Sequence, residues 1–368
     1  MKKPEPIYPY CYIAHDSRES SKKLSDAAKK GLDCLRVPFT DHGLETAACF
    51  KYLVGNRALE YTSQDYTDGM VDAYLDFMSL CEEKSSVLPA QDGVPVEYDK
   101  SFVVDCANGI GAIRVEEMQK RLRDHMDIVV INRRHAVPSK LNHECGAEFV
   151  QRNRLEPMEL VQSMPGKVAC LDGDGSRLLY LKRNNSRTPV IIEGDKQVAL
   201  IMQYIKGLVE RLDIEESISL FVAVTEYANP SALRFFKKHK IACSTINNLR
   251  EATNEAKKHT IGATSHANGS CAFHVRSDDL NKALQGKEQH PASRKLKALL
   301  KITNPFGSDA IANLLIVEAV LKDKGIGVAQ LTGLYRDHPS QRFKAPVDDR
   351  RSFKTDYAGT RLVEPIEL

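Results

Sequence analysis

The sequence contains no tryptophan, and it lacks the apolar stretches and cysteine spacings that mark several classes of protein. No apolar run approaches the roughly 20 residues needed to cross a bilayer, so we expect no membrane partner. The N-terminal segment MKKPEPIYPY has no apolar core, which argues against a signal peptide. The nine cysteines are odd in number and include no C-x-x-C pair. We therefore expect reduced thiols and a cytoplasmic protein.

An excess of charge of either sign is also missing. Lysine and arginine total 52 against 49 aspartates and glutamates, which leaves a net charge of +3. Short basic runs such as Lys22-Lys23, Arg133-Arg134 and Lys237-Lys238 lie far apart in the sequence, without interleaved stacking aromatics. We therefore expect no nucleic-acid partner. The 42% of hydrophobic residues is ordinary for a globular protein.

What the sequence does contain is an alternation of apolar strands and amphipathic helices. It predicts an α/β protein with mixed, mostly parallel sheets that helices flank on both faces. A length of 368 residues favours two or three domains. Residues 83–97 are predicted to form a linker, 178–181 and 190–192 a hairpin, and 276–295 a polar loop. Strands are expected at 10–14, 35–39, 101–105, 127–131, 167–171, 218–225, 241–244 and 259–263; helices are expected from Leu24 to Leu32 and at 61–80, 193–212, 231–239, 248–258 and 308–324.

An acidic loop, Leu171-Asp-Gly-Asp-Gly-Ser-Arg177, directly follows the apolar strand predicted at 167–171. Its glycines let the chain turn tightly, so that the carboxylates of Asp172 and Asp174 converge. Mg²⁺ binds few carboxylates together with phosphate oxygens, and Arg177 can fork onto a phosphate. Ligands of parallel sheets bind at the carboxyl ends of strands, where this loop lies. The loop predicts a divalent-cation site beside a phosphate, although a polar turn capped by Asp172 would use the same residues.

Two enzyme families use such a loop, and the loop alone leaves both open. Phosphatases of the haloacid dehalogenase type have D-x-D-G-[ST] after an apolar strand, which would make Asp172 the nucleophile and Asp174 the acid/base. Phosphohexomutases have a magnesium loop D-G-D-x-D-R with three aspartates. The sequence matches that loop at Asp172, Gly173, Asp174 and Arg177, and it has Ser176 in place of the third aspartate.

The blocks that flank the loop favour the second family. With them, the chain resembles the eukaryotic phosphoacetylglucosamine mutases, a branch of the α-D-phosphohexomutase superfamily, from about residue 10 to residue 360. The most specific block is Lys140-Leu-Asn-His-Glu-Cys-Gly-Ala147. The others are His15-Asp-Ser-Arg18, Asp41-His-Gly-Leu44, Asp105-Cys-Ala-Asn-Gly-Ile-Gly-Ala112, Glu193-Gly-Asp-Lys196, Tyr227-Ala-Asn229, Ala267-Asn-Gly269, Gly307-Ser-Asp-Ala-Ile311 and Val347-Asp-Asp-Arg-Arg351.

The resemblance implies a fold, an activity and site residues. The fold would be tandem phosphohexomutase-type domains: 1–96 a partial first domain with linker, 97–195 the metal-loop domain, 196–330 the sugar-recognition domain, and 331–368 a linker toward a fourth. The activity would be interconversion of N-acetylglucosamine 6-phosphate and 1-phosphate, on the way to UDP-N-acetylglucosamine. Asp172, Asp174 and Ser176 would bind Mg²⁺, while Arg177, Asn268 and Gly269 would bind a phosphorylated amino sugar.

The sequence departs from the family in three places. We find no T-A-S-H-N-P loop with its phosphoserine and no R-P-S-G-T phosphate clamp, and we expect the chain to be truncated at both ends, with no catalytic residue of its own. The segment Thr264-Ser-His-Ala-Asn268 resembles a serine loop, but its position aligns it with the sugar-recognition loop. That loop is E-A-N-G-H-G in the family and His266-Ala-Asn-Gly-Ser-Cys271 here.

These departures predict a degenerate mutase with little or no activity alone. Serine oxygen is a neutral and weaker ligand than a carboxylate, so Mg²⁺ binding should be weakened. Two other functions stay open. One is a non-catalytic pseudoenzyme that holds a phosphosugar or an intact mutase partner, and the other is a haloacid-dehalogenase-type phosphatase that uses Asp172 and Asp174.

Overall fold

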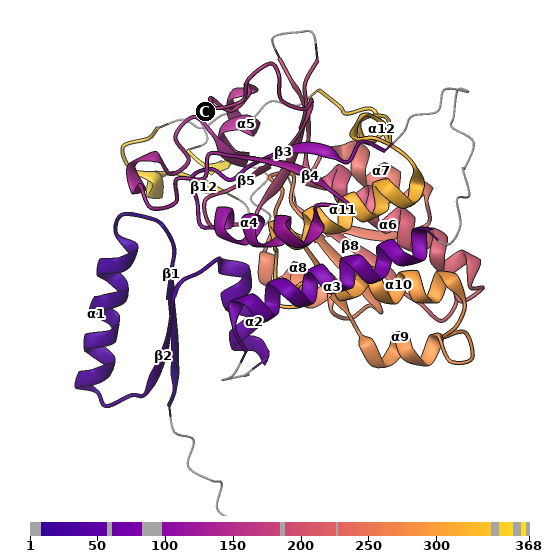
Figure 1. Ribbon diagram of the computed structural model, residues 1–368, viewed down its shortest axis with the longest axis horizontal. Coiled ribbons are helices and arrows are strands. Elements are labelled where there is room, and N and C mark those ends of the chain that lie inside the picture. Colours follow the sequence, from indigo (N-terminus) through magenta and orange to yellow (C-terminus); the bar gives the residue numbers. More distant parts are fainter. Residues whose placement is uncertain are drawn as a thin grey trace, which may run out of the picture.

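The computed structural model describes residues 9–56, 61–82, 98–184, 188–225, 227–339, 346–355 and 362–365. Two sheets lie inside a set of helices, and a small N-terminal unit stands to one side of this body (Figure 1). In each sheet three neighbouring strands pair in parallel, and the strands added beyond them on one side pair antiparallel. The predicted α/β class with mixed, mostly parallel sheets is confirmed. The predicted linker 83–97 lies outside the described residues.

The N-terminal unit consists of β1 (Cys11–His15), α1 (Ser21–Cys34) and β2 (Phe39–Leu44). The two strands pair in parallel, with Cys11 opposite Phe39, so this is the predicted β-α-β unit. The second strand was predicted at 35–39 and begins only at Phe39. Leu35 instead caps α1 and is 75% exposed, because nothing among the described residues packs over it.

The larger sheet has the strand order β4-β3-β5-β6-β7. Its strands β4, β3 and β5 pair in parallel, and the predicted hairpin β6–β7 continues the sheet antiparallel beyond β5. Every residue of β5 is buried, because alternate side chains enter the core on each face of the sheet. The bounds are β3 Ser101–Asp105, β4 Asp127–Ile131, β5 Lys167–Leu171, β6 Leu178–Lys182 and β7 Val190–Ile192.

The smaller sheet has the order β11-β10-β8-β9 and the same design. Its parallel strands are β8 (Leu220–Val224), β9 (Ala242–Thr245) and β10 (Ile261–Ser265). The strand β11 (Cys271–Val275) folds back antiparallel to β10. The loop between β10 and β11 therefore leaves the sheet at its carboxyl edge, where ligands of such sheets bind.

Helix α11 (Ala310–Lys324) is central to the packing, with every residue from Ala310 to Leu321 buried. It contacts β6 and the helices α3 (Ser63–Glu82), α4 (Gly111–Leu122) and α6 (Gly194–Arg211). The remaining helices are α2 (Ala47–Asn56), α5 (Gly146–Asn153), α7 (Pro230–Lys238), α8 (Leu249–Ala256), α9 (Ser277–Ala283), α10 (Pro291–Lys301) and α12 (Val328–Thr332). Two 3₁₀ turns (Pro138–Lys140, Arg350–Ser352) and the short strands β12 (Lys354–Thr355) and β13 (Leu362–Glu364) complete the described elements.

The predicted polar loop at 276–295 is wrong, because α9 and the start of α10 occupy it. Helix α10 begins at Pro291, which suits a first helical position, and the His290 side chain caps it by accepting the amide of Ala292. Leu296 and Leu299 then pack into the core. The polar composition of the segment suggested a loop, but α10 is an amphipathic helix whose apolar face packs against α3 and α6.

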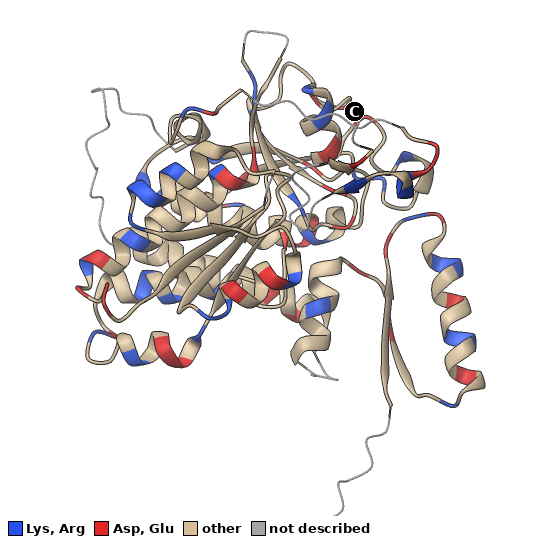
Figure 2. Cartoon of the chain, turned by 180° about the vertical axis from the view of Figure 1, so that it is seen from behind, with Lys and Arg blue, Asp and Glu red and all other residues tan. Residues whose placement is uncertain are grey.

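Charged residues of both signs alternate along the outer helices, most plainly on α1 (Figure 2). This is the ordinary pattern of a solvated surface. In the part of the chain that the structure describes, no helix has the length and the apolar character to span a membrane.

Candidate metal and phosphate site

The acidic loop joins β5 to β6 and folds around the buried side chain of Asp172. One carboxylate oxygen, Oδ1, accepts the amides of Ser176 at 2.8 Å and Arg177 at 3.0 Å. The other, Oδ2, accepts the Arg177 Nε at 2.6 Å and the Ser176 hydroxyl at 3.2 Å. Asp172 therefore organises the loop, and a group bound to its carboxylate would displace one of these four donors.

Asp174 and Ser176 supply the second and third oxygens of the loop. Asp174 is partly exposed, and its Oδ1 accepts the Ser176 amide at 3.2 Å. Burial raises the pKa of Asp172, and the charge of Asp174 adds to this effect, against the opposing influence of Arg177. Two carboxylates this close favour a bound cation.

The three oxygens of the loop can form only part of the coordination shell of Mg²⁺. Within the described ranges, no cluster of three or more histidine, cysteine, aspartate or glutamate side chains could hold a metal ion. Mg²⁺ in proteins commonly takes one or two carboxylates and completes its shell with water and phosphate oxygens. Asp172, Asp174 and the Ser176 hydroxyl match that arrangement, in which water or phosphate oxygens complete the shell.

Arg177 is engaged with carboxylates in the structure. Besides its bond to Asp172, its Nη2 lies 3.3 Å from an oxygen of Glu148 on α5. A cation held by Asp172 would compete with Arg177 for this carboxylate and weaken the ion pair. The guanidinium could then turn to a phosphate beside the cation, a geometry that suits its planar fork.

The predicted sugar loop lies directly against the acidic loop. The carbonyl of Gly269 accepts the amide of Leu178, the residue after Arg177, at 3.1 Å. Gly269 has φ +91°, and a Cβ there would lie 2.2 Å from the Leu178 carbonyl oxygen, so only glycine fits. Asn268 is partly exposed and accepts the Ser270 amide at 3.0 Å. The structure thus brings together the two predicted groups of site residues.

Ser265, the serine of the loop-like segment Thr264–Asn268, ends β10 and is fully buried. A serine that gives or takes a phosphoryl group must reach a substrate phosphate. The position of Ser265 is that of a core residue of the smaller sheet.

Two segments distant in the sequence donate hydrogen bonds to backbone carbonyls of the acidic loop. Neither was predicted to contact it. The Ala47 amide donates to the Asp174 carbonyl at 3.2 Å. In addition, the Ala310 amide donates to the Gly175 carbonyl at 3.0 Å, and the Ser308 hydroxyl donates to the Ser176 carbonyl at 2.6 Å. No local sequence signal names such partners, because each bond joins segments more than 100 residues apart.

The turn that follows β3, beginning at Asp105, packs against the acidic loop. Asp105 is fully buried and accepts the amides of Ala107 and Gly146 at 3.0 and 2.6 Å and the Asn132 side chain at 2.8 Å. Burial raises the pKa of Asp105 to about 6, although these donors act against the rise. Asp105 therefore caps and holds the turn that follows β3.

Gly109, in the same turn, allows the close approach of the acidic loop. A Cβ at residue 109 would lie 2.2 Å from the Gly173 carbonyl oxygen, which accepts the Ile110 amide at 3.1 Å. We expect Gly109→Ala to lower the free energy of unfolding by about 1–3 kcal/mol through this clash. Urea unfolding followed by circular dichroism would measure it.

The matched control is Gly207→Ala, inside α6. A Cβ at residue 207 would meet no atom within 4 Å. Alanine there should be neutral or stabilise the protein by up to about 1 kcal/mol, because glycine disfavours a helix interior. Equal stability of the Gly109→Ala and Gly207→Ala variants would contradict the close approach of the two loops.

Comparison with known proteins gives a consistent family. Two family models match the chain: "Phosphoacetylglucosamine mutase AMG1, domain II" over residues 61–179, and "Phosphoacetylglucosamine mutase AMG1, domain III" over residues 193–326.

Curated relatives extend the match to almost the whole chain. The phosphoacetylglucosamine mutase of Mus musculus is 31% identical over 371 residues, and that of Sus scrofa is 30% identical over 365 residues. Each alignment covers 97% of this chain and 65% of the relative. The chain therefore spans about two thirds of the length of these relatives.

A solved structure shares the fold. The Aspergillus fumigatus N-acetylphosphoglucosamine mutase, solved in complex with GlcNAc-6P and magnesium, superposes with a TM-score of 0.83 at 27% sequence identity. The superposition covers 99% of this chain and 73% of that one.

Proposed function

Since this chain belongs to the phosphoacetylglucosamine mutase family, we propose that it is a mutase-like protein that binds Mg²⁺ and a phosphorylated amino sugar at residues 172–177 and 266–270. The observation that carries this proposal is the bond from the Leu178 amide to the Gly269 carbonyl, because it joins the acidic loop to the sugar loop. The magnesium and GlcNAc-6P complex of the Aspergillus relative supports the ligand classes.

Each residue of the site has a role that follows from its chemistry. Asp172, Asp174 and Ser176 would hold magnesium, which would neutralise charge on a phosphoryl group. Arg177, once released from Asp172, would donate to the phosphate oxygens. The partly exposed Asn268 would present its amide to sugar hydroxyls, whose hydrogen bonds give such sites their selectivity.

We propose further that these 368 residues bind the phosphosugar and convert it slowly or not at all. Phosphoryl transfer needs a nucleophile that reaches the substrate. The sequence has no T-A-S-H-N-P segment, and Ser265 lies in the core. A neutral Ser176 in the metal loop would also weaken the electrostatic stabilisation of a transferring phosphoryl group.

Calorimetric titration tests the binding proposal. N-acetylglucosamine 6-phosphate should bind in the presence of Mg²⁺ and bind at least about tenfold more weakly in EDTA, because the phosphate completes the ion's shell. Asp174→Asn should reproduce the EDTA result. Asp213→Asn is the matched control: this exposed aspartate lies at φ +48°, which asparagine tolerates, and it should bind like the wild type.

Two results would contradict the proposal. One is phosphosugar binding that is equal with Mg²⁺ and with EDTA. The other is release of inorganic phosphate that disappears in Asp172→Asn, the behaviour of a phosphatase with an aspartate nucleophile. A coupled isomerase assay at a rate close to that of the Aspergillus enzyme would contradict the proposed loss of activity.

A further inference from the structure

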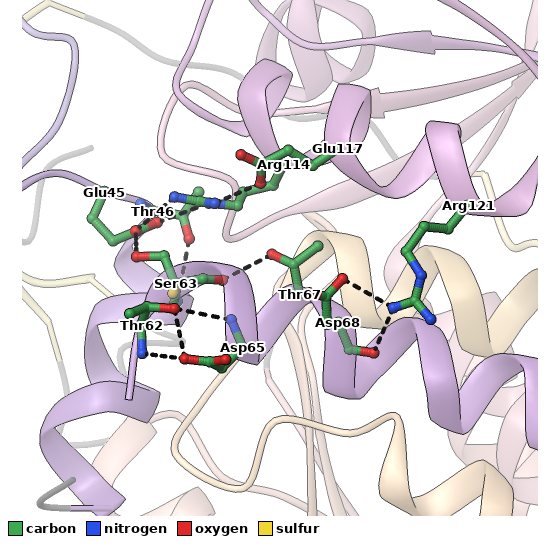
Figure 3. Close-up of polar contacts among 11 residues, drawn as sticks. Glu45, Thr46, Thr62, Ser63, Asp65, Thr67, Asp68, Arg114, Glu117 and Arg121 are labelled. Atoms are coloured by element: carbon green, nitrogen blue, oxygen red, sulfur yellow. Dashed lines mark hydrogen bonds and ion pairs between the residues drawn. The ribbon is translucent and has the colours of Figure 1, made fainter. Parts of the chain in front are cut away.

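Glu45, the residue that follows β2, carries a carboxylate that is buried and fully engaged (Figure 3). Its side chain is 1% exposed and forms an ion pair with Arg114 of α4, in which Nη2 lies 3.0 Å from Oε2. The Ser63 hydroxyl at the start of α3 donates to the same oxygen. Oε1 accepts the amide of Thr46 at 2.7 Å. Glu45 thus ties the end of the N-terminal unit to two helices of the main body.

The next two residues lie against the acidic loop. Thr46 precedes α2 and caps it, since its hydroxyl accepts the Cys49 amide at 3.2 Å. Its methyl carbon lies 3.4 Å from the position of a Cβ on Gly175. Ala47 donates its amide to the Asp174 carbonyl at 3.2 Å. The ion pair of Glu45 is therefore one residue away from direct contact with the loop.

We propose that Glu45 is a positioning residue for the acidic loop, held by Arg114 and Ser63 so that Thr46 and Ala47 fix the backbone of Asp174 and Gly175. This inference rests on the proposed function where it concerns cation affinity. Glu45 touches no bound group, and it would act through the Ala47 amide on the loop that carries the two carboxylates.

The ion pair of Glu45 and Arg114 lies at the junction between the N-terminal unit and the main body. The unit stands apart from the main body (Figure 1), and Glu45 continues it directly, with its amide donating to the His15 carbonyl at 2.9 Å. Motion of the unit would reach the acidic loop through residues 45–47. A buried, charge-assisted anchor at the junction would isolate the loop from that motion, since such bonds are stronger and shorter than neutral ones.

A loss of positioning can be separated from a loss of stability with three variants. Glu45→Gln removes the charge of the anchor. Ala47→Pro removes only the amide that reaches Asp174, because proline is tolerated at the first position of a helix. Arg121→Gln is the control, because it breaks ion pairs from α4 to Asp68 and Asp72 of α3. The pair with Asp68 lies beside the Glu45 cluster in Figure 3, and the bonds of Arg121 go to α3 rather than to Thr46 or the acidic loop.

The first measurement is Mn²⁺ affinity, from the paramagnetic resonance signal of the free ion. We expect the dissociation constant to rise about tenfold in Glu45→Gln and in Ala47→Pro, as is usual for lost supports of metal ligands. The double variant should be no weaker than either single one, because both act on one path. Arg121→Gln should stay within about twofold of the wild type. Equal effects of Glu45→Gln and Arg121→Gln would overturn the inference.

The second measurement needs no metal. Amide hydrogen exchange of residues 174–177 in the metal-free protein should speed up in Glu45→Gln and Ala47→Pro and stay unchanged in Arg121→Gln, because only the first two loosen the loop. If the wild type binds no Mn²⁺, the proposed function fails. The hydrogen-exchange measurement still tests the positioning role of Glu45 in that case. Unchanged exchange in Glu45→Gln would overturn the positioning role by itself.

Discussion

Replacing Lys167 by methionine is expected to lower the free energy of unfolding by about 3–5 kcal/mol, because the change leaves the Glu318 carboxylate buried without its cation. Lys167 begins β5, Glu318 lies within α11, and Nζ and Oε2 are 2.7 Å apart. Both side chains are almost fully buried. The pair therefore joins the larger sheet to the central helix.

The neighbours of this pair show why removing one partner is so costly. Glu318 also accepts the hydroxyls of Tyr98 and Tyr180, each at 2.9 Å. The Lys167 ammonium lies 4.6 Å from the centroid of the Phe102 ring and 2.5 Å from the Asp99 carbonyl oxygen. Each partner is thus satisfied in an interior site, and a charge left alone there has no access to water.

A double variant separates the charges from the packing. Lys167→Met with Glu318→Gln should lose less stability than the sum of the single variants, because no unpaired charge remains. Urea unfolding followed by circular dichroism is suitable, since the chain has no tryptophan. The control is Lys258→Met, which breaks a surface pair with Glu255 in which the lysine is 67% exposed, and it should change stability by less than about 0.5 kcal/mol. A Lys167→Met loss as small as that of the control would contradict a buried pair.

The sequence predicted the parallel core well because its strands are continuous apolar runs. The strand 167–171 and the helix 308–324 are buried along most of their length, so composition alone marks them. The wrong predictions concern segments whose secondary structure depends on tertiary contacts. The apolar residues Leu35 and Val37 are exposed and partly exposed, while β2 uses polar residues that pair with β1. The predicted boundaries after residues 96, 195 and 330 stay predictions.

The candidate site shows the same division between local and distant information. A motif of six residues names Asp172, Asp174 and Arg177, because their spacing carries the chemistry. The supports from Ala47 and Ser308 have no such signature, since a backbone amide or a hydroxyl can hold a loop from any sequence. The family resemblance placed Asn268 near the acidic loop, and the Leu178–Gly269 bond explains how the fold holds the two loops together. The roles of these residues stay predictions until binding is measured.

The last prediction concerns Ser176, the residue at which the acidic loop departs from three carboxylates. Its hydroxyl lies 3.2 Å from Asp172 Oδ2, and its amide donates to both aspartates. An aspartate at residue 176 would therefore place a third carboxylate beside the other two. We expect Ser176→Asp to tighten Mn²⁺ binding by about tenfold or more, because affinity for hard cations rises with the charge of the ligands.

The same substitution should destabilise the metal-free protein. Burial and the charge of Asp174 already raise the pKa of Asp172, and another negative charge would add repulsion within the loop. The unfolding temperature should fall in EDTA and rise above that of the wild type at saturating Mn²⁺, because only the folded state binds the ion. This opposite response separates a metal effect from a general change in stability.

Ser176→Asn completes the experiment as a control of nearly the same shape without the charge. It should leave Mn²⁺ affinity within about threefold of the wild type, since a neutral oxygen replaces a neutral oxygen. Equal affinities for the aspartate and asparagine variants would show that residue 176 does not face the ion, and the metal site would then consist of Asp172 and Asp174 alone. A tighter aspartate variant would instead place a third ligand at this residue and support the weaker cation binding expected for a serine there.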